Sequence, residues 1–146
     1  MPLSLKVILR DLKIIVMKKT NDQAKRLIRD CFFVRQGERR ERCFYSEILY
    51  VEASGCYCYI YRRDKPRLLI AHPLLMLEPF LPEDRFKRVH RSYIVNLYEV
   101  DGFIGKALCI GKNVFPVSPS YRTEVFGYFD FWDIVRKKKG QEGKDM

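Results

Sequence analysis

The sequence predicts a mainly β domain of short antiparallel strands, with one small central helix and one helix near the C-terminus. Three observations predict this class. Turn signals recur roughly every 8–12 residues along the chain. Several short runs alternate apolar and polar residues. The chain is 14% aromatic, with 10 Phe and 9 Tyr, and aromatic residues favour strands. At 146 residues and 47% hydrophobic residues, we expect one domain with its own core.

The first strands are predicted from turns and alternation. Residues 31–35 and 40–45 flank Gln36-Gly37-Glu38-Arg39, which is typical of a hairpin turn. An apolar run at 48–53 ends at Ser54-Gly55. Beyond that turn, tyrosines at every second position indicate a strand, and a further strand is expected over 67–71. The three alternating tyrosines are Tyr57, Tyr59 and Tyr61.

The central helix is predicted over 73–81. Pro73 suits a first helical turn, and Pro79 and Pro82 limit the length of the helix. Its apolar side chains recur at helical spacing, at Leu74, Leu77, Phe80 and Leu81.

Further strands are expected over 98–104, 107–110 and 113–117. Ser118 can cap a helix there, with Pro119 at its first position. The predicted apolar face of this helix consists of Tyr121, Val125, Phe126, Phe129 and Trp132.

The chain divides into three parts. Residues 1–30 are an N-terminal extension, which we expect to be partly helical or disordered, with a short helix over 21–30. Residues 31–132 form the domain, and residues 133–146 form a charged flexible tail. The net charge of +10 belongs to the ends, because 1–42 carry +7, 136–146 carry +3, and the middle is neutral. Such basicity favours an acidic partner, which the central domain would bind only through charges segregated on one face.

Several classes are not expected. Five cysteines, an odd number without regular spacing, argue against a disulfide framework, and two histidines leave few metal ligands. We expect no metal and no cofactor. The most apolar stretch, 7–17, contains three charges and is too short to span a membrane, so a cytoplasmic protein is the expectation. No phosphate loop, HExxH or carboxylate pair is present, and an enzyme is not expected.

Residues 86–97 are the most informative stretch. Arg85, Lys87, Arg88 and Arg91 place four cations within seven residues. Arginine donates two parallel hydrogen bonds to phosphate or to guanine. Taken alone, such a run is more often a solvated strand end. Two other loops, 54–59 and 118–122, could add polar contacts to nucleic acid. The tyrosines of the 57–61 strand could stack single-stranded bases, although packing across strands explains them better.

Five spaced blocks stand out along the chain: Ile48-Leu49-Tyr50-Val51-Glu52-Ala53-x-Gly55-x-Tyr57, Leu74-x-x-Leu77, Leu81-Pro82, Phe86-x-Arg88-Val89-His90-Arg91-Ser92-Tyr93-Ile94-Val95-Asn96 and Pro116-Val117-Ser118. Together these blocks resemble the LytTR domain, the DNA-binding domain of bacterial response regulators of the LytR/AlgR type. The resemblance covers about residues 31–129.

This resemblance implies elongated antiparallel β-sheets whose loops enter successive major grooves. It implies base reading by Arg91, Tyr57 and Cys58, and a third contact from the helix start at Ser120, Tyr121 and Arg122. The predicted contacts to the DNA backbone are His90, Arg88 and Ser92, and Lys87 joins this set. The sequence departs from the family at Cys56, Cys58, Pro119 and Ser120, where many members carry polar or basic residues.

We therefore expect a sequence-specific transcription regulator that binds double-stranded DNA, on paired direct repeats where two copies could form a homodimer. Residues 1–30 are too few for a receiver domain, so a stand-alone module is expected. Two alternatives stay open. One is a protein-interaction module that has lost specific DNA binding, which the neutral middle of the chain favours. The other is a binder of single-stranded nucleic acid or RNA.

Overall fold

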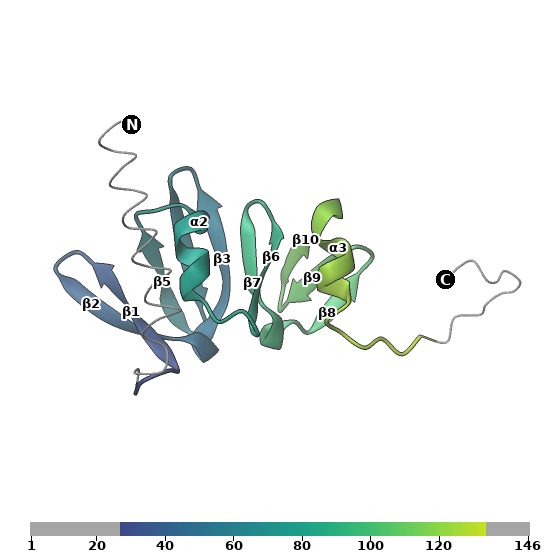
Figure 1. Cartoon of the computed structure of the whole chain (residues 1–146), viewed down its shortest axis with the longest axis horizontal. Coiled ribbons are helices and arrows are strands. Elements are labelled where there is room, and N and C mark those ends of the chain that lie inside the picture. The colour runs from purple at the N-terminus through teal and green to yellow at the C-terminus, as the bar shows by residue number, and fades with distance from the viewer. Residues whose placement is uncertain (1–26, 134–146) are drawn as a thin grey trace, which may run out of the picture.

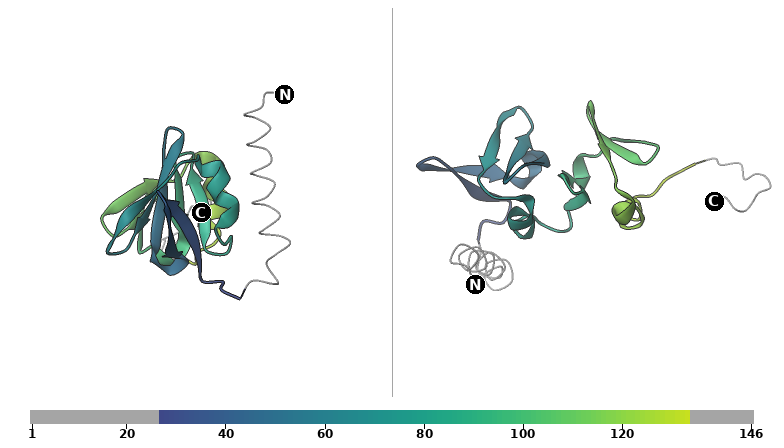
Figure 2. Two further views of the ribbon diagram at one scale, coloured as in Figure 1. Left: turned by 90° about the vertical axis from the view of Figure 1, so that its left-hand side faces the viewer. Right: turned by 90° about the horizontal axis from the view of Figure 1, so that it is seen from above.

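The computed structural model describes residues 27–133, which form three antiparallel sheets and two short α-helices. The sheets follow one another along the long axis of the molecule, so the domain is elongated (Figure 1). Figure 2 shows the same row from one end and from above. The mainly β class predicted from sequence is confirmed.

The strands form a two-stranded, a five-stranded and a three-stranded sheet. The first pairs β1 (Cys31–Gln36) with β2 (Arg39–Phe44). The second has the order β5-β4-β3-β7-β6, and its strands are β3 (Ile48–Ser54), β4 (Tyr57–Arg62), β5 (Lys65–Ile70), β6 (Phe86–His90) and β7 (Tyr93–Asn96). The third has the order β10-β9-β8, and its strands are β8 (Gly102–Ile104), β9 (Ala107–Ile110) and β10 (Asn113–Pro116).

Short helices connect the sheets. The central helix is α2 (Leu74–Leu77), which continues as the 3-10 turn η3 (Glu78–Phe80), as the sequence predicted. The C-terminal helix is α3 (Pro119–Phe126). Two further 3-10 turns, η2 (Tyr45–Glu47) and η4 (Leu97–Glu99), lie at strand ends.

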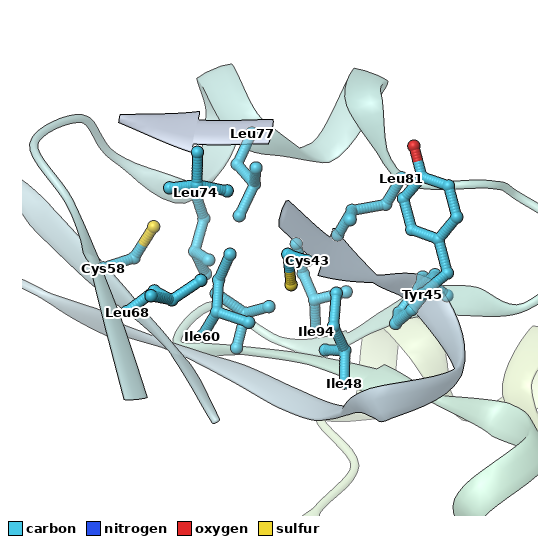
Figure 3. Close-up of a cluster of buried hydrophobic side chains, with 13 residues drawn as sticks. Cys43, Tyr45, Ile48, Cys58, Ile60, Leu68, Leu74, Leu77, Leu81 and Ile94 are labelled. Atoms are coloured by element: carbon cyan, nitrogen blue, oxygen red, sulfur yellow. The ribbon is translucent and has the colours of Figure 1, made fainter. Parts of the chain in front are cut away.

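The five-stranded sheet separates two hydrophobic clusters, because alternate residues of a strand face opposite sides. On one side, Ile48, Ile60 and Leu68 of the sheet pack under the β1–β2 hairpin and against Leu74 and Leu77 of α2 (Figure 3). On the other side, Tyr50 and Val95 of the sheet pack against Leu108 and Phe115 of the three-stranded sheet and Val125 of α3. Both covering layers thus fix the sheet that carries the β3–β4 and β6–β7 turns.

A buried amide determines where β7 ends. Asn96 is fully buried, and its Nδ2 donates a 2.8 Å hydrogen bond to Ile48 O. Its Oδ1 accepts a 3.0 Å hydrogen bond from Tyr98 N and caps η4. The strand predicted over 98–104 is therefore wrong in its first half, since the strand begins at Gly102.

The C-terminal helix begins as predicted but ends early. Pro119 occupies the first turn, whereas Ser118, at the cap position, makes no side-chain cap bond. The predicted apolar face is confirmed at Val125, which is buried, and at Tyr121, Phe126 and Phe129, which pack against the same cluster. Trp132 is instead 85% exposed and lies beyond the helix. The helix predicted over 21–30 does not include residues 27–30, which are irregular. Residues 1–26 and 134–146 lie outside the described part of the chain.

Candidate nucleic-acid interface

Two backbone hydrogen bonds join three loops at one edge of the domain. Ala53 N donates to Ser92 O at 2.9 Å, which ties the end of β3 to the β6–β7 turn. Ser118 N donates to Val89 O at 2.9 Å, which ties the start of α3 to the end of β6. The β3–β4 turn, the β6–β7 turn and the first turn of α3 therefore lie along one edge, uppermost in Figure 1.

Arg88 braces the β6–β7 turn. Its Nε donates to His90 O at 3.1 Å, and its Nη2 donates to Arg91 O at 3.0 Å. Its Nη1 pairs with Glu78 Oε1 at 2.9 Å, which connects the turn to η3. Every nitrogen of this guanidinium thus has a protein partner. The structure places Arg88 as a support of the turn, whereas the sequence suggested a contact to the DNA backbone.

His90 and Ser92 complete the turn. Ser92 N donates a 3.1 Å hydrogen bond to His90 Nδ1, and the imidazole lies 5.5 Å from the Tyr93 ring, measured between ring centroids. Because Nδ1 accepts, the neutral ring carries its proton on Nε2. His90 therefore offers an Nε2–H donor to a neighbouring group.

Arg91 projects from this braced turn. Its side chain is exposed, and within residues 27–133 its guanidinium makes no hydrogen bond or ion pair. Arg88, three residues earlier, differs because its partners hold it in place. Arg91 therefore presents an unengaged fork of donors on a rigid support, and this is the arrangement that bidentate recognition requires.

The β3–β4 turn presents small and aromatic groups. Gly55 adopts a φ of 61°, a left-handed conformation that favours glycine, and a Cβ there would meet nothing within 4 Å. Ser54 and Cys56 are exposed, and Tyr57 is 50% exposed. This turn is thus open to an approaching partner.

The predicted contact by Cys58 is wrong. Its side chain is fully buried, and Figure 3 shows it among Ile60, Leu68 and Leu74. Burial raises the pKa of the Cys58 thiol to about 11. The alternation of β4 explains the error, because Cys58 lies on the same face as Ile60. The exposed thiol of this loop is Cys56, which sequence reasoning missed; its position directly after Gly55, in the turn, was the available signal.

The start of α3 brings Ser120, Tyr121 and Arg122 to the same edge, but their side chains differ in exposure and in their contacts. Ser120 is exposed. Tyr121 is partly buried and packs against the second hydrophobic cluster. Arg122 folds back on its own loop, where its Nε donates to Val117 O at 2.9 Å. Ser120 is therefore the most accessible of the three side chains.

Lys87 lies apart from the three loops. Its Nζ is 4.0 Å from Glu124 Oε2 and 5.1 Å from the Tyr128 ring centroid. A hydrogen bond with Tyr128, more than the nearby carboxylates, raises the pKa of Lys87. The structure therefore directs this cation towards the end of α3.

Two of the three β4 tyrosines are engaged in packing. Tyr61 stacks on Tyr50 at a centroid distance of 4.5 Å, and the guanidinium of Arg67 lies 3.9 Å from the Tyr59 ring centroid. Arg67 also donates to the Tyr61 hydroxyl at 3.0 Å. Packing thus accounts for Tyr59 and Tyr61, and it leaves Tyr57 at the loop edge.

All five cysteines are free thiols. Residues 27–133 contain no group of three or more His, Cys, Asp or Glu side chains placed to hold a metal ion. Among the same residues, no helix has the length and apolar character needed to cross a membrane.

Within residues 27–133, the fold and the loop edge define a mainly β domain that presents three loops, and no recognition helix, along one edge. A family model described as the LytTr DNA-binding domain matches residues 39–129, and the chain belongs to this LytTR family. The family is one of DNA-binding domains and is not catalytic.

Among solved structures, the chain is similar to one from Bacillus cereus, described as the LytTr DNA-binding domain of a methyl-accepting/DNA response regulator. The two are 23% identical with a TM-score of 0.57, and the match covers 68% of this chain and 99% of the other. This likeness supports the LytTR fold. None of the curated proteins compared gives a match.

Proposed function

We propose that this protein is a transcription regulator that binds duplex DNA sequence-specifically, reading the major groove through loops. The observation that carries the proposal is the shared edge of three loops, held by the bonds Ala53 N–Ser92 O and Ser118 N–Val89 O. The exposed Arg91 guanidinium lies in the middle loop and has no partner among residues 27–133. The membership of this chain in a family of DNA-binding domains supports the same function. A cytoplasmic location follows from a function on DNA.

Arg91 is the proposed base reader, because a free arginine fork can donate to both O6 and N7 of guanine. Arg88 supports it by fixing the backbone on which it stands. His90, through Nε2–H, and Ser92 are proposed to contact phosphates, which position the protein without reading sequence. The flanking loops contribute Tyr57 and Cys56 from β3–β4 and Ser120 from α3. A domain this small covers few bases, so we propose paired direct repeats with two copies on DNA.

Selection of bound fragments from random duplex DNA tests the proposal. We expect a defined sequence to be enriched, and the purified protein to bind it about 10³-fold or more tightly than a scrambled duplex at the same salt concentration. A salt series with both duplexes separates base reading from charge attraction. Equal binding to selected and scrambled duplexes, or preference for single strands, would contradict specific duplex recognition.

A competition assay addresses the single-strand alternative. Tyr59 is covered by Arg67, and Tyr61 is stacked on Tyr50, so we expect single-stranded oligonucleotides to compete only weakly for the duplex-bound protein. Sequence-matched single strands that displace the duplex at equal concentration would favour that alternative instead.

A further inference from the structure

An open apolar groove lies away from the residues assigned to DNA binding. It runs between the β1–β2 hairpin, β5 and α2–η3 and has a volume of about 640 Å³. This volume is typical of pockets that hold a ligand or a peptide segment. Its apolar lining includes Phe32, Phe33, Leu69, Met76, Leu77 and Phe80.

The walls of the groove are fixed. The buried side chain of Arg62 pairs with Glu41 of β2 at 3.1 Å and so holds the hairpin against the five-stranded sheet. Gln36 Nε2 donates to Leu69 O at 2.7 Å, which bridges β1 and β5. Phe33 is nonetheless 50% exposed, and Leu69 is 41% exposed. The guanidinium of Arg42 lies 5.1 Å from the Phe33 ring centroid and covers only part of this surface. A braced apolar surface that stays partly exposed is typical of an interaction site.

An apolar stretch near the N-terminus, before β1, matches the character of this groove. Of the fifteen residues 3–17, ten are apolar: Leu3, Leu5, Val7, Ile8, Leu9, Leu12, Ile14, Ile15, Val16 and Met17. The connection from this stretch to the groove, residues 18–30, is mostly polar. Thirteen residues can span up to about 43 Å when extended. The groove wall begins at Phe32, so the stretch can reach it with chain to spare.

We propose that residues 3–17 pack into this groove of the same chain and cover Phe33 and Leu69. Both surfaces are apolar, and their association removes both from water. The short covalent connection favours an occupant from the same chain, because such a tether gives an effective concentration in the mM range. The N-terminal extension is then part of the folded domain and covers the apolar face that β1, β5 and α2 leave open.

Photo-crosslinking of the full chain tests the proposal. A benzophenone amino acid replaces Phe33, whose half-exposed side chain tolerates the change, and the irradiated protein is digested and analysed by mass spectrometry. We expect crosslinks from position 33 to residues 3–17 in a product with the mass of one chain. The matched control places the same probe at Val114 of β10, which is 53% exposed and on a different sheet. That probe should not reach residues 3–17.

Two variants show whether apolar packing drives the contact. We expect the double substitution Leu9→Asp and Leu12→Asp to lower the crosslink yield by about tenfold or more, since two buried leucines become charged. Lys13→Asp, which changes charge at a neighbouring polar position, should leave the yield within about twofold. A product with the mass of two chains would identify a second copy as the occupant. The proposal would be overturned by that two-chain product, by crosslinks confined to the groove walls, or by the absence of any crosslink to residues 3–17.

Discussion

The Nη2 atom of Arg88 donates a 3.0 Å hydrogen bond to the carbonyl oxygen of Arg91, so one arginine holds the turn from which the other projects. The same guanidinium also contacts His90 O and Glu78. The two cations are three residues apart, yet one is fully engaged and the other is unengaged within the described residues. This division of roles lets a two-residue turn present a side chain in a fixed direction.

We predict that Arg88→Ala weakens DNA binding by disordering the turn. The substitution removes hydrogen bonds from a charged donor to two carbonyls, so the free energy of unfolding should fall by about 1–3 kcal/mol. Because the lost group is a brace, the slope of log affinity against log salt should change little. A phosphate contact would instead reduce that slope by about one. Urea unfolding and a salt series of binding assays measure the two effects.

Glu78→Gln is the matched control for Arg88. It removes one ionic partner but leaves both bonds to the turn carbonyls, and the pair is partly exposed, so we expect a stability loss below about 1 kcal/mol. DNA affinity should remain close to that of the wild type. A salt slope reduced by one in Arg88→Ala, with unchanged stability, would show that Arg88 contacts phosphate.

Thiol labelling should separate two cysteines that lie two residues apart. At pH 8 we predict fast alkylation of exposed Cys56 and slow alkylation of Cys58, whose pKa is raised to about 11 by burial. Cys43, with its pKa raised to about 12, should be equally protected. Mass spectrometry after timed labelling identifies the modified sites. Bound duplex should slow the labelling of Cys56. Equal labelling of Cys56 and Cys58 would contradict the burial of Cys58.

We predict that ending the chain at Val135 weakens binding to all duplexes alike. The removed residues carry five Lys or Arg and two Asp or Glu, and each phosphate neutralised contributes about 0.9 to the salt slope. Fluorescence anisotropy with selected and scrambled duplexes at several salt concentrations measures the effect. An unchanged salt dependence, or a loss of affinity for the selected duplex alone, would contradict a tail that binds DNA only through its charge.

Asn96→Ala should destabilise the domain by about 1–3 kcal/mol, because it leaves Ile48 O without its partner inside the core. Urea unfolding monitored by circular dichroism tests this expectation. Asn113→Ala, at the exposed start of β10, is the control and should change stability by less than about 0.5 kcal/mol. Similar effects for both substitutions would show that the buried amide has no special role.

Much of the fold follows from local sequence. The turn at Gly37 and the alternation of the β4 tyrosines predict strands that the structure contains. Pro73 and Pro119 mark the starts of the two helices. These signals are local, since a turn residue or an alternating run acts on its own neighbours. The spaced motifs predict the LytTR family, and the match of the family model to residues 39–129 confirms it.

The rest depends on contacts between distant residues. The role of Arg88 requires Glu78 and the turn carbonyls to converge, and the sequence shows only another cation. The end of β7 depends on Asn96 reaching Ile48, 48 positions earlier. Cys58 was misplaced because its neighbours in β4, and the core they face, decide which side is buried. Whether the site residues contact DNA stays a prediction.

The most direct test of the account is the binding of Arg91→Ala to the selected and scrambled duplexes at one salt concentration. We predict a loss of about 1–3 kcal/mol on the selected duplex, relaxed preference at one base position, and only a small loss on the scrambled duplex. The stability of the variant should match that of the wild type, because this guanidinium has no partner within residues 27–133. An equal loss on both duplexes would contradict base reading by Arg91.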